Sequence, residues 1–385
     1  MKSAMLLTGG LVACLVVGAA ASPDSLEGVT AHSGKPETKY ANSWDPNAAA
    51  AYLDRRQSWW MEWPRAKRDH ETVCVSCHTA VPYALSRSAL RTALAEQTPS
   101  PNERRLLYSV TKRVRLWKEV EPFYKDADRG PYKSVESRGT ESVLNALILS
   151  SRAAQNGQLS NDARKAFENM WAEQQIAGKQ KGAWLWLRFK NEPWEADDSD
   201  YFGATLAAVA VGIAPGNYRA TPEAQTRLRP LREYLNRECA VQIPINRVLL
   251  LWAAAKLPGL LEPDRLKAII GELLEKQQAD GGWSVSSLSG DWKRADGTSQ
   301  ETTSDGYATG LITFVLQQVG ISPENAKLQR GLAWLIANQD KTEGSWPAYS
   351  LNKSKENHIS PETALFMNDA ATSYAVLSLT FANRR

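Results

Sequence analysis

The residues best suited to chemistry are two cysteines and a histidine in the string Cys74-Val75-Ser76-Cys77-His78. Two thiols at this spacing can add to the vinyl groups of a haem, and the histidine that follows can ligate its iron. The alternatives are a zinc site or a redox disulfide. Zinc needs four ligands, and a thioredoxin-like pair needs a βαβ setting, neither of which the sequence supplies. We therefore expect covalent haem c.

A second candidate set is acidic. The segment EADDSD holds four acids within six residues, among them Glu195, Asp197 and Asp198. Crowded like charges raise the pKa of one carboxyl, which suits a general acid, whereas a helix N-terminus stabilises the charged form. The sequence leaves this balance open.

The elements that must position these residues belong to an internal repeat. The clearest copy, from Arg330 to Trp346, consists of a helix that ends in Gln, a polar loop and Gly-x-Trp. Weaker copies end at Trp63, Trp184 and Trp283. We expect each Gln to satisfy helix-end backbone groups and each indole to pack under the next helix.

Helical periodicity dominates from Pro46 onward and predicts twelve helices in six pairs. Buried helices that alternate with amphipathic ones imply two concentric rings. The expected fold is all-α, an (α/α)6 toroid of six inner and six outer helices over residues 47–385. The outer helices are predicted at 48–62, 101–119, 161–175, 222–236, 263–277 and 324–338, and the inner ones at 79–94, 141–154, 199–212, 243–256, 305–319 and 369–382.

Parallel inner helices would begin at one mouth of such a ring. Two of the inner-helix segments, those that contain Asp197 and Asp305, align without gaps. Alignment of the repeats places Glu141, Asp197, Asp305 and Asp369 at one equivalent position, at the same mouth as His78. Helix capping alone explains an acid at such a position, and we favour it for all of these except Asp197.

The second axial position of a haem at His78 has several candidate ligands. Ring closure would bring Met367 near His78, although a core role suits this methionine as well. His358, His70 and Met61 are further candidates, and an open position is the remaining alternative. Cys239 is expected to be a buried small hydrophobe.

The repeat resembles the Gln–Trp repeat of squalene–hopene cyclases and of the wider terpene cyclase and prenyltransferase toroids, over about residues 46–385. CVSCHT is similar to the haem-binding string of exported c-type cytochromes. In the cyclases the general acid is the middle Asp of D-x-D-D, which implies that Asp197 is the acid here and Asp198 its neighbour. This chain has Glu195 in the first place, and it has room for one barrel where the cyclases have two helical domains.

Charge and the N-terminal sequence bound the location and partners. The 46 basic and 42 acidic residues are interspersed, without the basic stripe of a nucleic-acid binder. Lys2, an apolar run and small residues predict a signal peptide over 1–21, followed by a flexible linker over 22–46. Lipoprotein anchoring at Cys14 ranks second. No later segment is apolar for long enough to span a bilayer. We expect the mature protein to lie in the periplasm or outside the cell, and we expect it to be a monomer.

Together these features predict a monohaem protein that exchanges electrons with, or oxidises, a bound apolar molecule such as an isoprenoid. A redox partner protein is the other expected partner. One alternative is a proton-initiated isoprenoid cyclase or isomerase with Asp197 as the acid. Another is a non-catalytic scaffold that binds a partner or a glycan, because a fold alone does not give a function.

Overall fold

Helices make up nearly all the regular structure in the computed structural model, which describes residues 44–124, 130–352 and 360–383. The predicted all-α class is confirmed for these residues. The predicted signal peptide and most of the linker lie outside them. The helices are α1 (Pro46–Glu62), α2 (Ala80–Ala93), α3 (Pro101–Arg115), α4 (Gly130–Asn156), α5 (Asn161–Glu173), α6 (Ser199–Ile213), α7 (Pro222–Glu238), α8 (Pro244–Lys256), α9 (Pro263–Glu275), α10 (Gly306–Gln318), α11 (Ala326–Ala337) and α12 (Phe366–Ala382).

Two short strands, β1 (Lys67–Arg68) and β2 (Thr72–Val73), form an antiparallel hairpin between α1 and α2. His70 and Glu71 at its tip both have positive φ, of 52° and 57°. Such backbone is uncommon outside glycine and needs support from its surroundings. The hairpin leads directly into Cys74.

One predicted boundary is wrong. We expected the second inner helix at 141–154, but α4 begins at Gly130. Its first three turns carry mostly polar side chains, so hydrophobic periodicity does not mark them as helix. Ser137 and Thr140 are nevertheless buried there. Glu141 therefore lies inside a helix rather than at its start.

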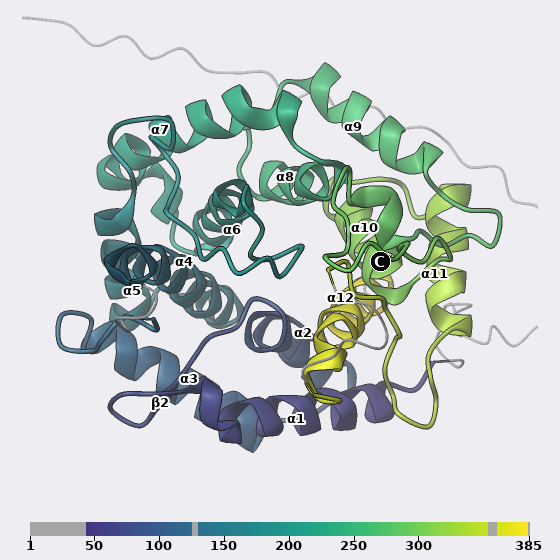
Figure 1. The fold of residues 1–385 in the computed structure, drawn as a ribbon, viewed down its shortest axis with the longest axis horizontal. Helices are drawn as coiled ribbons and strands as arrows, with labels where there is room; N and C mark the ends of the chain where they lie inside the picture. The colour runs from purple at the N-terminus through teal and green to yellow at the C-terminus, as the bar shows by residue number, and fades with distance from the viewer. Residues whose placement is uncertain (1–43, 125–129, 353–359, 384–385) are drawn as a thin grey trace, which may run out of the picture. The chain divides into compact units, whose positions relative to one another are not determined.

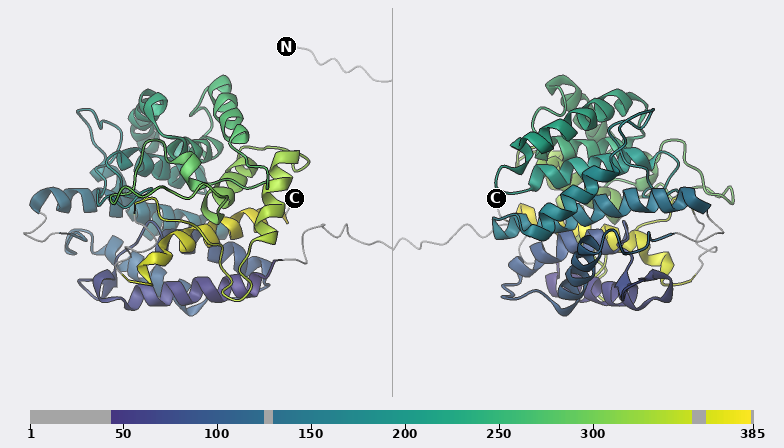
Figure 2. Two further views of the ribbon diagram at one scale, coloured as in Figure 1. Left: turned by 45° about the vertical axis from the view of Figure 1, so that its right-hand side comes forward. Right: turned by 90° about the vertical axis from the view of Figure 1, so that its left-hand side faces the viewer.

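The helices fall into an inner and an outer set (Figure 1). Each of α2, α4, α6, α8, α10 and α12 contacts the next in this order, and α12 contacts α2. The other six helices lie outside them, each against an inner helix. Figure 2 shows the same helices from two further sides. The first and last inner helices are thus neighbours, which brings residues from the two ends of the described chain together.

In three of the four copies the repeated glutamine ties its loop to the following outer helix. The side-chain amide donates both to the carbonyl of the loop glycine and to a carbonyl at or near the next outer helix. In the copy that ends at Trp63 the prediction is wrong, because the amide of Gln57 is buried without a hydrogen-bond partner among the described residues. The last copy bonds back to the residue that caps α1, which also closes the outer set. The acceptors are Gly182 and Arg227 for Gln174, Gly281 and Lys327 for Gln277, and Gly344 and Asp45 for Gln339.

The tryptophans of the last three copies are fully buried, and each indole N–H bonds a carbonyl of the preceding outer helix, with distances of 2.6–2.7 Å. A buried indole needs such an acceptor. The predicted structural role is confirmed for these three residues but not for Trp63, which is only half-buried. The pairs are Trp184 with Met170, Trp283 with Leu273 and Trp346 with Leu335.

The loop glycine of the last repeat allows a close approach of two chain segments. Gly344 has φ of 82°, and a Cβ on it would lie 2.1 Å from the carbonyl oxygen of Ala48 in α1. We expect Gly344→Ala to lower the free energy of unfolding by about 3 kcal/mol or more, from strain and clash together. Gly157 has φ of 72° but nothing within 4 Å, so Gly157→Ala should cost only about 1 kcal/mol. The free energy of unfolding of both variants is measured by urea denaturation. Equal losses would show that the close contact between Gly344 and Ala48 does not affect stability.

Candidate functional site

The cysteine–histidine segment is fixed at both ends. The indole N–H of Trp60 in α1 donates to the carbonyl of Cys74 at 2.7 Å. Ser76 Oγ accepts the backbone N–H groups of Thr79 and Ala80 at 3.3 and 3.0 Å. Ser76 therefore satisfies donors of the first turn of α2, as capping side chains do. The two thiols and the imidazole are held just before that helix.

His78 belongs to a buried relay with Thr79 and Asp369. Its Nδ1 lies 2.9 Å from Thr79 Oγ1, and this hydroxyl lies 2.6 Å from Asp369 Oδ2. Thr79 has one hydroxyl hydrogen, which it donates to the carboxylate, so its oxygen accepts from His78 Nδ1–H. In the neutral ring Nε2 then carries the lone pair. The relay thus fixes both the tautomer and the orientation of the imidazole.

Asp369 is in turn held by two residues of α1. Arg56 donates to both of its oxygens at 2.6 and 3.0 Å, and the Tyr52 hydroxyl donates at 3.0 Å. Burial raises the pKa of Asp369, while Arg56 opposes this most strongly. The capping role that we favoured for Asp369 is wrong, because its carboxylate bonds α1 and Thr79 side chains. The predicted proximity of Asp369 and His78 is confirmed, with Thr79 between them.

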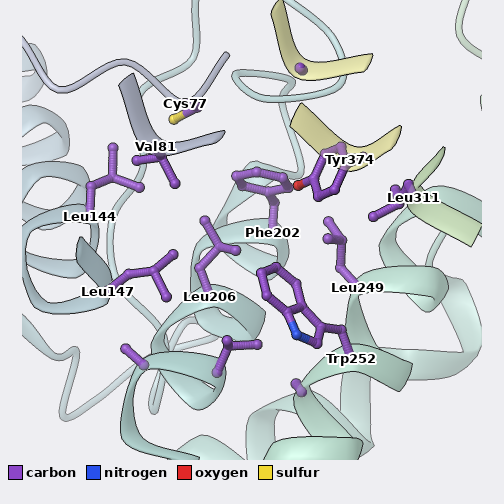
Figure 3. Close-up of a cluster of buried hydrophobic side chains, with 14 of the residues drawn as sticks. Cys77, Val81, Leu144, Leu147, Phe202, Leu206, Leu249, Trp252, Leu311 and Tyr374 are labelled. Carbon is purple, nitrogen blue, oxygen red and sulfur yellow. The ribbon is translucent and has the colours of Figure 1, made fainter. Parts of the chain in front are cut away.

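The two thiols are buried and protonated at neutral pH. Burial raises the pKa of Cys74 to about 11 and that of Cys77 well above its usual range. Figure 3 shows Cys77 at one end of a cluster of apolar side chains to which all six inner helices contribute, from Val81 of α2 to Tyr374 of α12. Reactive C-x-x-C pairs have lowered pKa values. These thiols therefore do not suit a thioredoxin-like reaction.

Three aromatic rings enclose the imidazole of His78. The ring of Phe366 stacks on it with centroids 3.7 Å apart, and Trp60 and Trp194 meet it edge-on at 5.0 and 5.5 Å. His78 is 5% exposed, and Cys77 is 6% exposed. The imidazole of His78 and the thiol of Cys77 are therefore almost completely covered by other side chains.

Within the described ranges, these three donors do not meet the requirement of a structural zinc site. A structural zinc draws four ligands to one ion at about 2.0–2.3 Å. Within the described ranges, no three His, Cys, Asp or Glu side chains are grouped so that they could hold one metal ion. In a c-type haem the sulfurs bond the porphyrin edge and only the histidine reaches iron, so Cys74, Cys77 and His78 need not converge.

The candidates for a sixth iron ligand are spread out. Met367 is buried and lines a cavity of about 20 Å³ with Phe366 and Trp194, both of which contact His78. Met61 is buried in α1. His70 is 43% exposed at the hairpin tip, 3.8 Å from Asp69. His358 lies outside the described residues.

Glu141 forms a fully buried ion pair with Arg113 of α3. The guanidinium donates to its carboxylate at 2.6 and 3.1 Å, and both side chains have no exposed surface. Arg113 also donates to Asp69 and Thr72 of the hairpin at 2.9 Å. The capping role favoured for Glu141 is wrong, and its place is under the hairpin that leads into Cys74.

Hydrogen bonding corrects the predicted equivalence of the acids. Each repeat tryptophan is followed two residues later by a backbone N–H that bonds a side-chain oxygen at the start of an inner helix. These oxygens belong to Asp200, Asp305 and Asn368, with Trp186, Val285 and Ala348 as donors. Asp197 therefore lies three residues before the equivalent position, which Asp200 occupies, and Asp369 lies one residue after it. A shift of three is almost one helical turn and keeps the apolar pattern, so periodicity did not expose it.

The acidic segment before α6 lies at a polar surface pocket. Asp197 is exposed, and Asp198 and Glu195 are half-buried. Asp197 and Asp198 line this pocket together with Arg188 of the same loop. Burial raises the pKa of Asp198. An acid that protonates an apolar substrate needs a dry site, and the exposed Asp197 does not have one.

Asp305 is the buried carboxyl with the clearest pH dependence. It caps α10 by accepting from Ala308 N at 2.9 Å, as predicted, but burial still raises its pKa to about 7 from 3.8. The folded state then holds this proton more tightly, so its contribution to stability is complete below about pH 4 and lost as pH rises to 7. We expect Asp305→Asn to flatten the loss of stability over this range, by at most about 1.4 kcal/mol per pH unit. The free energy of unfolding of each protein is measured by urea denaturation at several pH values. The same pH dependence in the parent and in Asp305→Asn would contradict this prediction.

Sequence reasoning missed Thr79, Arg56 and Tyr52. Thr79 directly follows the histidine, and a hydroxyl there could have been considered as a partner of the ring. Tyr52, Arg56 and Trp60 are spaced four residues apart and so share one face of α1. A charged residue within that otherwise apolar face was the available signal, because buried arginines need a partner.

Comparisons with known proteins give no family for this chain. No known protein-family description matches it, and no curated protein matches it. In the part of the chain that the structure describes, we find no helix whose length and apolar character would let it cross a membrane.

Proposed function

We propose that this protein is an exported (α/α)6 toroid that carries one covalent c-type haem on Cys74 and Cys77, with His78 as axial ligand. When bound, the haem supplies a one-electron redox centre. The protein would use it to exchange electrons with, or oxidise, an apolar molecule or to pass electrons to a partner protein. The observation that carries the proposal is the hydrogen bond between His78 Nδ1 and the Thr79 hydroxyl, which in turn donates to Asp369.

This relay matches what an axial histidine needs. Ligating histidines bond their other ring nitrogen to a carboxylate, carbonyl or water, which fixes the tautomer and raises ligand basicity. The Thr79 hydroxyl links Asp369 to His78 Nδ1 through two hydrogen bonds, and Arg56 holds the carboxylate in place.

The toroid assignment is supported by closure of both helix sets. The inner set closes through α12 and α2, and the outer set closes through Gln339, which bonds Asp45 at the start of α1. The Gln and Trp bonds recur in three loops, those that follow the outer helices α5, α9 and α11. A repeat of this type also supports the proposed likeness to squalene-cyclase toroids.

An apolar ligand is supported by the side chains between the inner helices. The cluster in Figure 3 is apolar and is reached by Cys77. Trp252 Nε1 lies within it, buried and without a hydrogen-bond partner among the described residues. Such a donor suits a mostly apolar molecule with one acceptor atom. The cyclase alternative has no comparable support, because Asp197 is exposed.

The test is covalent haem attachment. The full chain is produced with a c-type maturation system, and its absorption spectrum is recorded before and after chemical reduction, with a haem stain on a denaturing gel. We expect a Soret band, a reversible spectral change and a stained band. Cys74→Ala with Cys77→Ala should abolish the stain, whereas the matched control Cys239→Ala, at a buried cysteine in a different part of the fold, should keep it. Folded protein without haem would overturn the proposal.

A further inference from the structure

A separate cavity of about 250 Å³ lies between α2, α3 and α4. Much of its lining is apolar, and these side chains come from all three helices and the loop before α3. None of the residues that we assign to the haem site lines it. Its size is near the lower end for ligand pockets, about 300 Å³. The apolar lining residues are Tyr83, Ala84, Pro99, Leu106, Leu107 and Ile148.

Two arginines give this cavity a positive rim. Arg104 of α3 is exposed and Arg152 of α4 is half-buried, and both line the cavity. Glu103, the one acid in the lining, is already engaged, because it bonds Ser100 N at 2.7 Å and pairs with Arg91 at 3.4 Å. The positive charge of Arg91 offsets the negative charge of this carboxylate.

Within the described ranges, the guanidinium of Arg152 forms no ion pair and no hydrogen bond. A half-buried guanidinium beside apolar walls is poorly hydrated, so it favours an anion that can form two parallel hydrogen bonds. The nearby Gln155 uses its Nε2 to donate to Ser88 Oγ at 2.6 Å, and it forms no hydrogen bond with Arg152 among the described residues.

We propose that this cavity binds a small amphipathic anion, with an anionic head at Arg152 and a short apolar chain against Leu107 and Ile148. A purely apolar molecule would leave Arg152 without a counter-ion, and a small polar anion would leave the apolar walls unfilled. The combination of one charge and a short chain satisfies both. Carboxylate and phosphate heads share this chemistry. The site is independent of the haem proposal.

The test is calorimetric titration of the full chain with octanoate, with octyl phosphate to distinguish the head group. Acetate supplies the head without the chain, and 1-octanol supplies the chain without the charge. The variants are Arg152→Gln and the conservative Arg152→Lys. Arg229→Gln is the matched control, because Arg229 lines a surface pocket on α7, away from this cavity. Thermal unfolding by circular dichroism confirms that each variant is folded.

We expect octanoate or octyl phosphate to bind at least tenfold more tightly than either acetate or 1-octanol. Arg152→Gln should weaken binding about tenfold or more, while Arg152→Lys recovers part of it and Arg229→Gln has no effect. A second variant, Ala84→Leu, fills the cavity and should reduce binding with Arg152 intact. Equal binding of 1-octanol and octanoate, an unchanged affinity in Arg152→Gln, or no binding of either anion would overturn the proposal.

Discussion

Replacing Asp369 with asparagine should lower the free energy of unfolding by about 3 kcal/mol or more. The change keeps the shape but removes the charge, and it puts an N–H₂ group where the carboxylate accepted from Arg56 or Thr79. Arg56 is 5% exposed and Asp369 is 2% exposed, so water cannot replace the lost hydrogen bonds. A buried guanidinium left without its partner accounts for the loss.

The neighbouring arginine offers a matched control. Arg55 pairs with Glu343 at 2.9 Å, but both side chains are more than half exposed. Exposed pairs contribute at most about 1 kcal/mol, so Glu343→Gln should have a small effect. Both variants are compared with the parent by urea denaturation. Similar losses at the two positions would mean that Asp369 is not the anchor that joins α1, α2 and α12.

A second large effect is expected at Glu141. Glu141→Gln should cost about 3–5 kcal/mol, because it leaves Arg113 buried without its main counter-ion. Arg113 also bonds Asp69 and Thr72, so we expect the hairpin before Cys74 to loosen. Hydrogen exchange at Thr72 N, which donates to the carbonyl of Asp69 at 3.1 Å, would report this directly.

Two comparisons make this prediction specific. Arg115 on the same helix pairs with Asp162 at 2.7 Å but is 65% exposed, so Asp162→Asn should destabilise far less. Replacing both members of the buried pair, as Arg113→Met with Glu141→Leu, should cost less than the sum of the two single changes. Strict additivity would show that the pair is not coupled.

The sequence predicted the helices well because their signals are local. Apolar periodicity, a proline near several helix starts and the Gln-to-Trp spacing act within a few turns, so the twelve helices appear close to their expected places. The long polar start of α4 was missed because its burial depends on neighbours, such as the hairpin, that periodicity within the helix cannot describe.

The site was predicted only in part. The cysteines and histidine are adjacent in sequence, and ring closure correctly indicated that Asp369 would lie near His78. Arg56 and Asp369, however, are separated by 313 positions. Which side chains meet across such a separation depends on the rotation of α1 and α12 in the packed structure. The mistaken equivalence of Asp197 with Asp305 has a similar origin, because a slip of nearly one turn leaves the apolar pattern intact.

The most direct test of the account is the intact mass of the denatured protein after production with a c-type maturation system. We expect the mass of the polypeptide plus one haem, retained under denaturing conditions because two thioether bonds hold the group. Loss of this increment in the variant lacking Cys74 and Cys77 would assign it to these residues. A folded protein with the mass of the polypeptide alone would contradict the account and leave the relay of His78, Thr79 and Asp369 as a structural element.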